Sequence, residues 1–226
     1  MRTRIFALIG ALVMALPAYA SLEAITNQDA VSGLREALVK GSQYAVDTLG
    51  KQDGFFGNAK VKIPLPASVQ KIEHLMRQFG MGKHADELVL TINRAAEAAV
   101  PEARALLVDS VKKMSVQDAK TILTGGQDSA TQYFKRTTSE QLRARFLPVV
   151  KKATAKVQLA QKYDEYAGKG AQFGLVKKED ANLDSYVTQK ALDGLFVMVA
   201  EQEAKIRQNP AGAASDILKK VFGALK

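Results

Sequence analysis

The residues in this sequence best suited to chemistry are cations that gather in one stretch. Residues 101–170 contain 13 Lys and Arg against 7 Asp and Glu, whereas the remaining residues after position 20 are nearly balanced, at 17 against 16. Unmatched cations attract anionic surfaces and ligands. We therefore predict an anion-facing or membrane-facing surface formed by Lys120, Lys135, Arg136, Arg143, Arg145, Lys151, Lys152 and Lys156.

A second candidate site is the glycine pair Gly125 and Gly126, which Ser129 follows at the start of the next helix. The first amides of a helix lack internal partners and can hold an anion, so these three residues could form an anion cradle. A glycine helix end followed by an Asp or Ser cap explains the same residues, and we give this interpretation more weight. No P-loop lysine follows the glycines, which argues against nucleotide hydrolysis.

Metal ligands are few in this chain. His84 and Glu87 lie one helical turn apart and could reach one cation, but the other histidine, His74, belongs to the preceding helix. A di-iron site in a helical bundle uses two Glu-x-x-His motifs, and the order here is reversed. The chain has no cysteine, which excludes disulfides and thiolate-bound metals. We predict no metal site and no cofactor.

Catalytic motifs are equally scarce. Glu97 and Glu102 could serve as a carboxylate pair for glycan cleavage, but Arg94 and Arg104 can simply pair with them. The sequence has no G-x-S-x-G or matching S-x-x-K motif for a serine nucleophile. We therefore predict no catalytic residues and favour a non-catalytic protein over an enzyme.

The N-terminus predicts where the protein acts. Arg2 and Arg4 precede an apolar run over residues 5–16, and small residues follow at Ala18 and Ala20. This pattern is typical of a secretory signal peptide cleaved between Ala20 and Ser21, and the run is too short to span a bilayer. Cleavage would lower the net charge of the 226-residue chain from +9 to +7, because two arginines leave. We predict a periplasmic protein with a signal peptide over residues 1–20 and one all-helical domain over residues 21–226.

The hydrophobic period after residue 20 is helical almost throughout, so we predict an all-α bundle of eight or nine helices. One segment breaks the pattern: residues 51–66 contain two glycines and two prolines, and Val61, Ile63 and Leu65 alternate with polar residues or proline. This alternation indicates an extended segment that wraps the bundle. Pro101 either opens a new helix or kinks a long one.

Start signals divide the second half of the chain. Ser115 with Asp118 resembles a capping box, Thr138 with Gln141 repeats that signal, and Asp184 is a plausible cap for the helix that ends near residue 209. Pro148 predicts a kink. A final amphipathic helix, over residues 210–226, either docks on the bundle or acts as a detachable arm, and docking is the favoured interpretation.

The helix that follows Thr138 has an apolar stripe with basic borders, which has two interpretations. Cations beside such a stripe can extend to the polar region of a membrane, as in a helix that lies on a bilayer. A core helix with a solvated basic rim has the same pattern, and we favour this interpretation. The stripe consists of Leu142, Phe146, Val149, Val150, Ala153 and Val157.

Several longer strings resemble those of one protein family. They are QDGFF (52–56), KIPLP (62–66), INRAAEAAVPEA (92–103), TILTGG (121–126), SATQYFKR (129–136), YVTQKALDGLF (186–196), IRQNPA (206–211) and LKKVFG (218–223). In this order they resemble an exported family of Gram-negative bacteria that is known as a domain of unknown function. The resemblance implies a helical periplasmic domain and brings no catalytic residue or ligand.

These observations favour a non-catalytic periplasmic protein that binds or scaffolds at an anionic envelope component, either a lipid or lipopolysaccharide. Peripheral contact with a membrane is compatible with this function. No aromatic platform suited to nucleic acid is evident, so we predict no nucleic-acid partner. One alternative is a carrier that holds an apolar ligand, such as a lipid, within the bundle. A weaker one is a hydrolase of envelope polymers.

Overall fold

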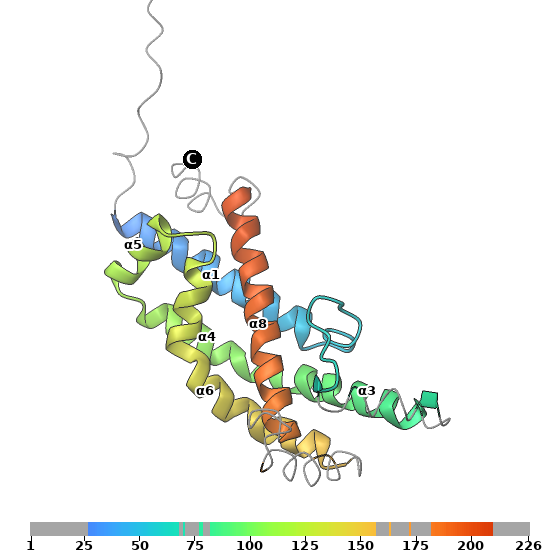
Figure 1. Ribbon diagram of the computed structural model, residues 1–226. Coiled ribbons are helices and arrows are strands. Elements are labelled where there is room, and N and C mark those ends of the chain that lie inside the picture. Colours follow the sequence, from blue (N-terminus) through green and yellow to red (C-terminus); the bar gives the residue numbers. More distant parts are fainter. Residues whose placement is uncertain are drawn as a thin grey trace, which may run out of the picture.

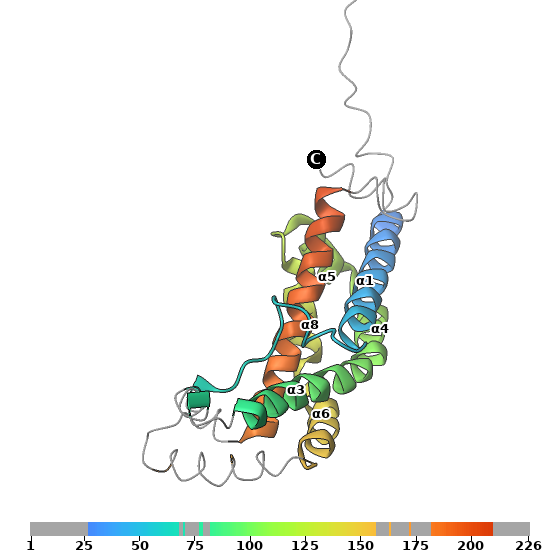
Figure 2. The same cartoon turned by 90° about the vertical axis from the view of Figure 1, so that its right-hand side faces the viewer.

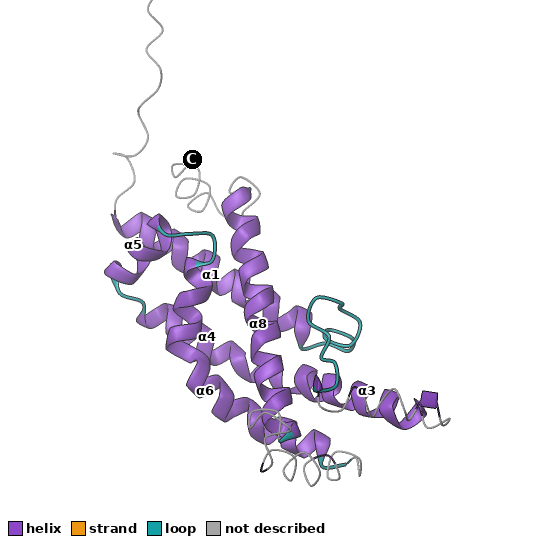
Figure 3. Cartoon of the chain, in the orientation of Figure 1, coloured by secondary structure: helices purple, strands orange, loops and turns teal. Residues whose placement is uncertain are grey.

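The computed structural model describes residues 27–67, 70, 77–78, 82–156, 163, 172 and 182–209. Its described part is helical and contains no strand, which confirms the all-α prediction (Figures 1 and 3), but it does not support the expected count of eight or nine helices. The elements are α1 (Asn27–Leu49), α3 (Gly82–Ala99), the 3-10 turn η1 (Val100–Glu102), α4 (Ala103–Lys113), α5 (Val116–Thr124), α6 (Ser129–Thr154) and α8 (Leu183–Gln208).

Three sequence predictions fall on other parts of the chain. The signal peptide, the helix expected around residues 69–79 and the C-terminal helix after residue 209 lie wholly or mostly outside the described residues.

The central element is α8, which runs the length of the molecule in both views (Figures 1 and 2) and packs on α6, α1 and α3. Its buried residues occur on several sides of the helix, as expected for an element surrounded by others. They are Leu183, Tyr186, Val187, Thr188, Ala191, Leu192, Gly194, Leu195, Phe196, Met198, Val199 and Glu203.

The segment over residues 51–66 lies on the core as predicted, but it is not extended throughout, because residues 51–61 mostly form hydrogen-bonded turns and only residues 62–66 lie outside them. Val61, Ile63 and Leu65 are all buried. The buried Asn93 of α3 holds the segment through its side-chain amide: the Ile63 amide donates to Asn93 Oδ1, and Asn93 Nδ2 donates to the Ile63 carbonyl, both at 2.8 Å. The Tyr186 hydroxyl of α8 donates to the Pro64 carbonyl at 3.1 Å. These contacts satisfy an extended backbone without a neighbouring strand.

A glycine on α8 makes room for the same segment. A Cβ on Gly194 would lie 2.6 Å from Cε1 of Phe55 and 3.3 Å from Cβ of Val61. Phe55 is fully buried, so its ring has little space to retreat. Glycine at this position therefore allows residues 55 and 61 to pack directly on the α8 backbone.

The helix boundaries support some start signals and correct others. Ser115 and Asp118 form a complete capping box at the start of α5, as predicted. The second signal was wrong, because Thr138 is buried inside α6 and its hydroxyl donates to the Phe134 carbonyl instead of capping a new helix. At α8 the cap is Asn182, whose side chain accepts the Ser185 amide at 2.9 Å. The predicted cap, Asp184, lies inside the first turn of α8 instead.

Pro101 and Pro148 have different effects on the helices near them. α3 ends at Ala99, and Pro101 lies in the 3-10 turn that joins it to α4. Pro148, by contrast, lies inside α6, which continues through it to Thr154. Pro148 is exposed, so the backbone carbonyl that it leaves without a helical donor is on the outer side of the helix, where water can reach it.

Candidate anion-binding surface

Residues 142–154 of α6 direct one face to the core and the other to solvent. Leu142, Phe146, Val150 and Thr154, four residues apart, are buried, and α6 packs on α8 and α3. Val149 and Ala153 are half-buried against the core, whereas Val157 lies outside the described residues. The apolar stripe is therefore a core face, which confirms the favoured interpretation.

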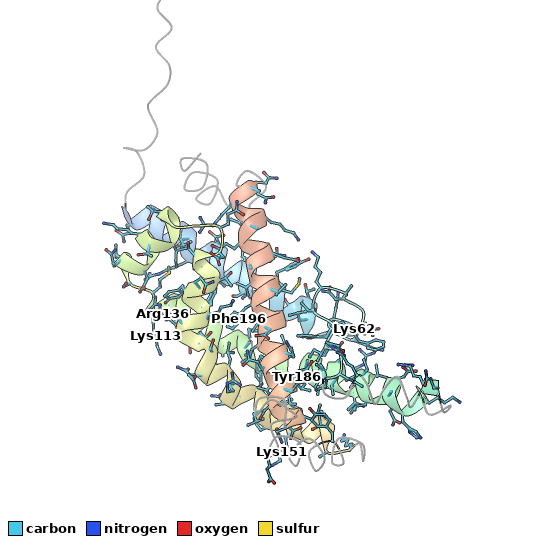
Figure 4. All side chains as sticks on the ribbon, viewed as in Figure 1. Lys62, Lys113, Arg136, Lys151, Tyr186 and Phe196 are labelled. Carbon is cyan, nitrogen blue, oxygen red and sulfur yellow. The ribbon has the colours of Figure 1, made fainter. Side chains whose placement is uncertain are left out.

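The cations in the second half of α6, together with Lys156 two residues after its end, lie outside this core face. We call Arg143, Arg145, Lys151, Lys152 and Lys156 the α6 cations. All five are exposed, and within the described part of the chain none forms an ion pair. Arg143 donates a hydrogen bond to the neutral amide oxygen of Gln189 on α8, which leaves its charge unbalanced. Lys151 lies at the outer margin near the end of α6 (Figure 4).

The remaining predicted cations have other neighbours. Arg136 pairs with Asp118 of α5, with 3.0 Å between guanidinium nitrogen and carboxylate oxygen, so its charge is balanced. The Lys135 ammonium lies 5.8 Å from the ring centre of Phe196. Lys120 is exposed on α5 and has no ion pair among the described residues. The eight predicted residues thus divide into the α6 cations and three cations nearer the α5–α6 turn.

The charge of Asp118 is stabilised in this arrangement. The hydrogen bond from Ser115 lowers the pKa of the Asp118 carboxyl most, desolvation raises it, and the hydrogen bond from Arg136 lowers it further. The net pKa is below its ordinary value. The cleft between α5 and α6 is therefore lined by an ionised carboxylate beside the arginine, together with Asp128 and Ser129. This charge balance gives the cleft no clear preference for an anion.

The predicted anion cradle lies beside a carboxylate of the protein itself, that of Glu203. Gly125 allows Ser129 to approach the end of α5, and the Ser129 hydroxyl donates to the Gly126 carbonyl at 2.9 Å. The next two amides of α6, those of Ala130 and Thr131, donate to the carboxylate of Glu203 on α8, at 2.9 and 3.0 Å. The start of α6 therefore binds an internal carboxylate, as the physics of a helix N-terminus favours.

Glu203 has further donors around it, and we call this group the Glu203 clamp. The Thr131 hydroxyl donates to Glu203 at 2.9 Å, and Arg207, one turn later on α8, donates from Nε and Nη2 at 3.1 and 2.9 Å. Arg207 also reaches the Ile122 carbonyl of α5 at 2.8 Å. Glu203 is 7% exposed, so three helices are joined through one buried charge.

Glu97 of α3 forms a second clamp of the same kind, the Glu97 clamp. One carboxylate oxygen accepts the amides of Phe55 and Phe56 at 3.0 and 3.1 Å, and the other accepts Arg94 at 2.6 Å. Arg94 also pairs with Asp53, which turns the chain with a φ of 63°. A carboxylate held by these partners fixes residues 53–56 on α3, which is a structural role.

The two residues of the candidate catalytic pair lie in different environments. Glu97 is buried in its clamp, whereas Glu102 is exposed in η1. The expected pairing of Arg94 with Glu97 is confirmed, but Arg104 pairs with Asp47 of α1. Both oxygens of Glu97 are thus occupied by its clamp partners, whereas Glu102 faces solvent.

No metal centre is evident in the described ranges. They contain no group of three or more His, Cys, Asp or Glu residues that could hold an ion. His84 and Glu87 are exposed near the start of α3, and His74 lies outside the described residues.

Two spaces bear on the idea of an internal ligand. The apolar gap between α1, α5, α6 and α8, beside Leu34, Ala130 and Ile206, measures about 20 Å³, which is roughly the size of one water site. An open groove of about 550 Å³ lies between residues 56–65 and α3. Lys62 (labelled in Figure 4) borders this groove. Its ammonium lies 4.2 Å from the ring centre of Phe56. The gap is far too small for a lipid chain, and the groove is open to solvent.

Sequence comparison identifies the family. The family model described as a protein of unknown function (DUF4197) matches residues 24–223. The chain belongs to this family. No curated protein and no solved structure matches the chain. None of the described helices of this DUF4197 member combines the length and apolar character of a membrane span.

Most of the strings that carried the family resemblance meet at the two clamps. QDGFF supplies Phe55 and Phe56 to the Glu97 clamp, and INRAAEAAVPEA supplies Arg94 and Glu97. YVTQKALDGLF supplies Gly194, which lies beside Phe55 outside the clamp itself. TILTGG, SATQYFKR and IRQNPA contribute residues 122, 130–131 and 207 to the Glu203 clamp. In this DUF4197 chain the strings just named therefore contribute to the fold, and the α6 cations lie outside them.

Proposed function

We propose that this protein is a non-catalytic periplasmic protein that binds an anionic component of the bacterial envelope through the α6 cations. The observation that carries the proposal is the absence of an acidic residue between positions 141 and 156. This interval contains five exposed cations without an ion pair in the described structure. Such a concentration of positive charge attracts phosphate-bearing surfaces.

Cations elsewhere in the chain are often paired, which makes the α6 cations stand out. Arg94, Arg104 and Arg207 each contact a carboxylate. Lys151 and Lys152 are adjacent in the last turn of α6, and Lys156 follows two residues after its end, so positive charge accumulates there without a compensating carboxylate among residues 141–156. Lysines in a last helical turn interact favourably with the helix dipole, but Arg143 and Arg145 lie well before that turn. An external anion would neutralise the α6 cations and so reduce the repulsion between them.

The envelope location rests on the sequence pattern of residues 1–20 and on the family resemblance. An exported protein meets phospholipid head groups and lipopolysaccharide phosphates, and each Lys or Arg near an anionic membrane surface contributes about 1 kcal/mol of attraction. Removing two lysines from the contact would therefore weaken binding by about 2 kcal/mol, which is roughly thirtyfold.

Vesicle sedimentation tests the proposal. The purified protein is mixed with phosphatidylcholine vesicles, with or without phosphatidylglycerol, and in a second arm with lipopolysaccharide. We expect binding to the anionic samples at low salt and its loss at high salt, where screening is strong. The N-terminus of each sample is checked by mass spectrometry, because a retained apolar run over residues 5–16 would itself bind bilayers.

Two charge-reversal variants make the test specific. K152E/K156E removes two α6 cations, and K51E/K83E removes two exposed, unpaired lysines elsewhere with the same change of net charge. We expect K152E/K156E to weaken binding by roughly thirtyfold or more and K51E/K83E to weaken it far less. Equal effects of the two variants, or no binding of the unmodified protein at low salt, would overturn the proposal.

A further inference from the structure

The outer face of α6 has an apolar centre among its cations. Leu147 is 38% exposed, and Ala144, Pro148 and Ala155 are also exposed. At 100° per residue Ala144, Leu147 and Pro148 fall within an arc of about 100° on the helix, and Ala155 is the residue that caps it. This arc is separate from the buried face of Leu142, Phe146 and Val150, so α6 presents a second, smaller apolar surface to solvent.

The cations surround this centre in a regular way. Arg143 and Lys151 lie one turn before and one turn after Leu147, while Arg145 and Lys152 lie one turn before and after Pro148. The nearest acidic residue before them on α6 is Glu140, seven positions before Leu147. Asp184 of α8, near the end of α6, accepts the Thr154 hydroxyl. Leu147 and Pro148 thus have four exposed cations one helical turn before or after them along α6.

This combination suits the surface of an anionic phospholipid bilayer. Long Lys and Arg side chains can hold their charges at the phosphate level while apolar groups between them enter the boundary of the acyl chains. A free polyanion would use the charges and leave Leu147 in water. We infer that the face around Leu147 and Pro148 inserts into the head-group region of an anionic bilayer, with α6 lying along the membrane surface. The inference rests on the proposed function and specifies its contact.

The chain contains no tryptophan, which permits a direct test. In L147W the only indole reports on the proposed contact. In L90W it reports on Leu90 of α3, which is 37% exposed and so matches Leu147 closely. On phosphatidylglycerol vesicles we expect the L147W emission to shift to shorter wavelength and to become shielded from iodide. The L90W emission should stay as it is in water.

Sedimentation of the same samples separates the two proposals. Binding of L147W without a spectral shift would overturn insertion and leave the proposed function standing. An equal shift in L90W would also overturn the assignment to this face. Absence of binding of the unmodified protein to phosphatidylglycerol vesicles would overturn insertion, and absence of binding to lipopolysaccharide as well would overturn the proposed function. A further set of samples contains polyphosphate in place of vesicles. Tight binding to polyphosphate without binding to vesicles would overturn the assignment to a bilayer.

A second variant tests insertion without a probe. L147N keeps every charge and removes apolar surface from an exposed position, so its far-UV circular dichroism should match that of the unmodified protein. We expect L147N to bind phosphatidylglycerol vesicles about fivefold to tenfold more weakly, with the same salt dependence. L90N is the control and should bind as the unmodified protein does. Unchanged affinity of L147N would overturn the inference.

Discussion

Replacing Glu203 with alanine should destabilise the protein far more than replacing a glutamate two residues away. Glu203 accepts the amides of Ala130 and Thr131 and pairs with Arg207. In E203A both amides lose their partner, and Arg207, whose side chain is 16% exposed, loses its carboxylate. Removing one member of a buried, hydrogen-bonded charge pair costs about 3–5 kcal/mol, because the remaining groups stay desolvated.

The matched control is E201A. Glu201 lies on the same helix and pairs with Lys60 at 2.6 Å, but their side chains are 26% and 65% exposed. An ion pair of this kind contributes about 0–1 kcal/mol. Because both variants change Glu to Ala within α8, the difference in helix propensity cancels when they are compared.

Urea unfolding followed by circular dichroism measures the free energy of unfolding of each variant. For a chain of this size, the loss in E203A corresponds to a fall in Tm of roughly 6–20 °C. Amide exchange adds a local readout, since the Ala130 and Thr131 amides should exchange faster in E203A. E203Q, which keeps one acceptor oxygen and loses the charge, should lie between E203A and the unmodified protein. It supplies the comparison if E203A fails to fold.

Equal losses in E203A and E201A, within about 1 kcal/mol, would refute the reasoning, because the clamp would then contribute no more than a surface ion pair. Unchanged exchange of the two amides would refute it independently.

The other predictions concern two helix glycines and one carboxylate. G194A should lower the free energy of unfolding by about 1–3 kcal/mol, because the new Cβ would lie 2.6 Å from the ring of Phe55. G41A should raise the free energy of unfolding by up to about 1 kcal/mol, because its Cβ would meet only ordinary contacts at 3.6 and 3.9 Å. Urea unfolding measures both variants, and a change of the same sign in G194A and G41A would contradict this contrast. The hydrogen bond from Ser115 lowers the pKa of Asp118, so this carboxylate stabilises the fold above its ordinary pKa, and the contribution disappears as pH falls through the lowered value. The difference in stability between the unmodified protein and D118N should therefore shrink from pH 7 to pH 3 in urea titrations at each pH, and a constant difference would count against the ionised form.

Local patterns in the sequence predict much of this fold. The start of α5 follows from a capping box, whose two residues are only three positions apart. The alternation of Val61, Ile63 and Leu65 reveals a buried face without knowledge of the partner. Thr138 misleads because a threonine hydroxyl can bond the carbonyl four residues earlier as readily as it caps a helix.

The clamps could not be found in this way. Glu97 binds amides 41 and 42 positions away, and Glu203 binds amides 72 and 73 positions away. In the sequence each glutamate resembles a surface carboxylate, since nothing local distinguishes it. The α6 cations were predicted from composition, but Leu147 was not, because its exposure depends on which side of α6 faces α8 and α3.

The position of α8 in the chain also determines when folding can finish. α1, α3 and α6 all pack on α8, yet α8 is the last described element to leave the ribosome. Their buried faces and the Ala130 amide must wait for residues 183–208, so the core closes only after α8 has been synthesised. Under the proposed envelope location, this delay would keep the nascent chain unfolded while it crosses a membrane. An order of elements that slows folding would then be an advantage for transport.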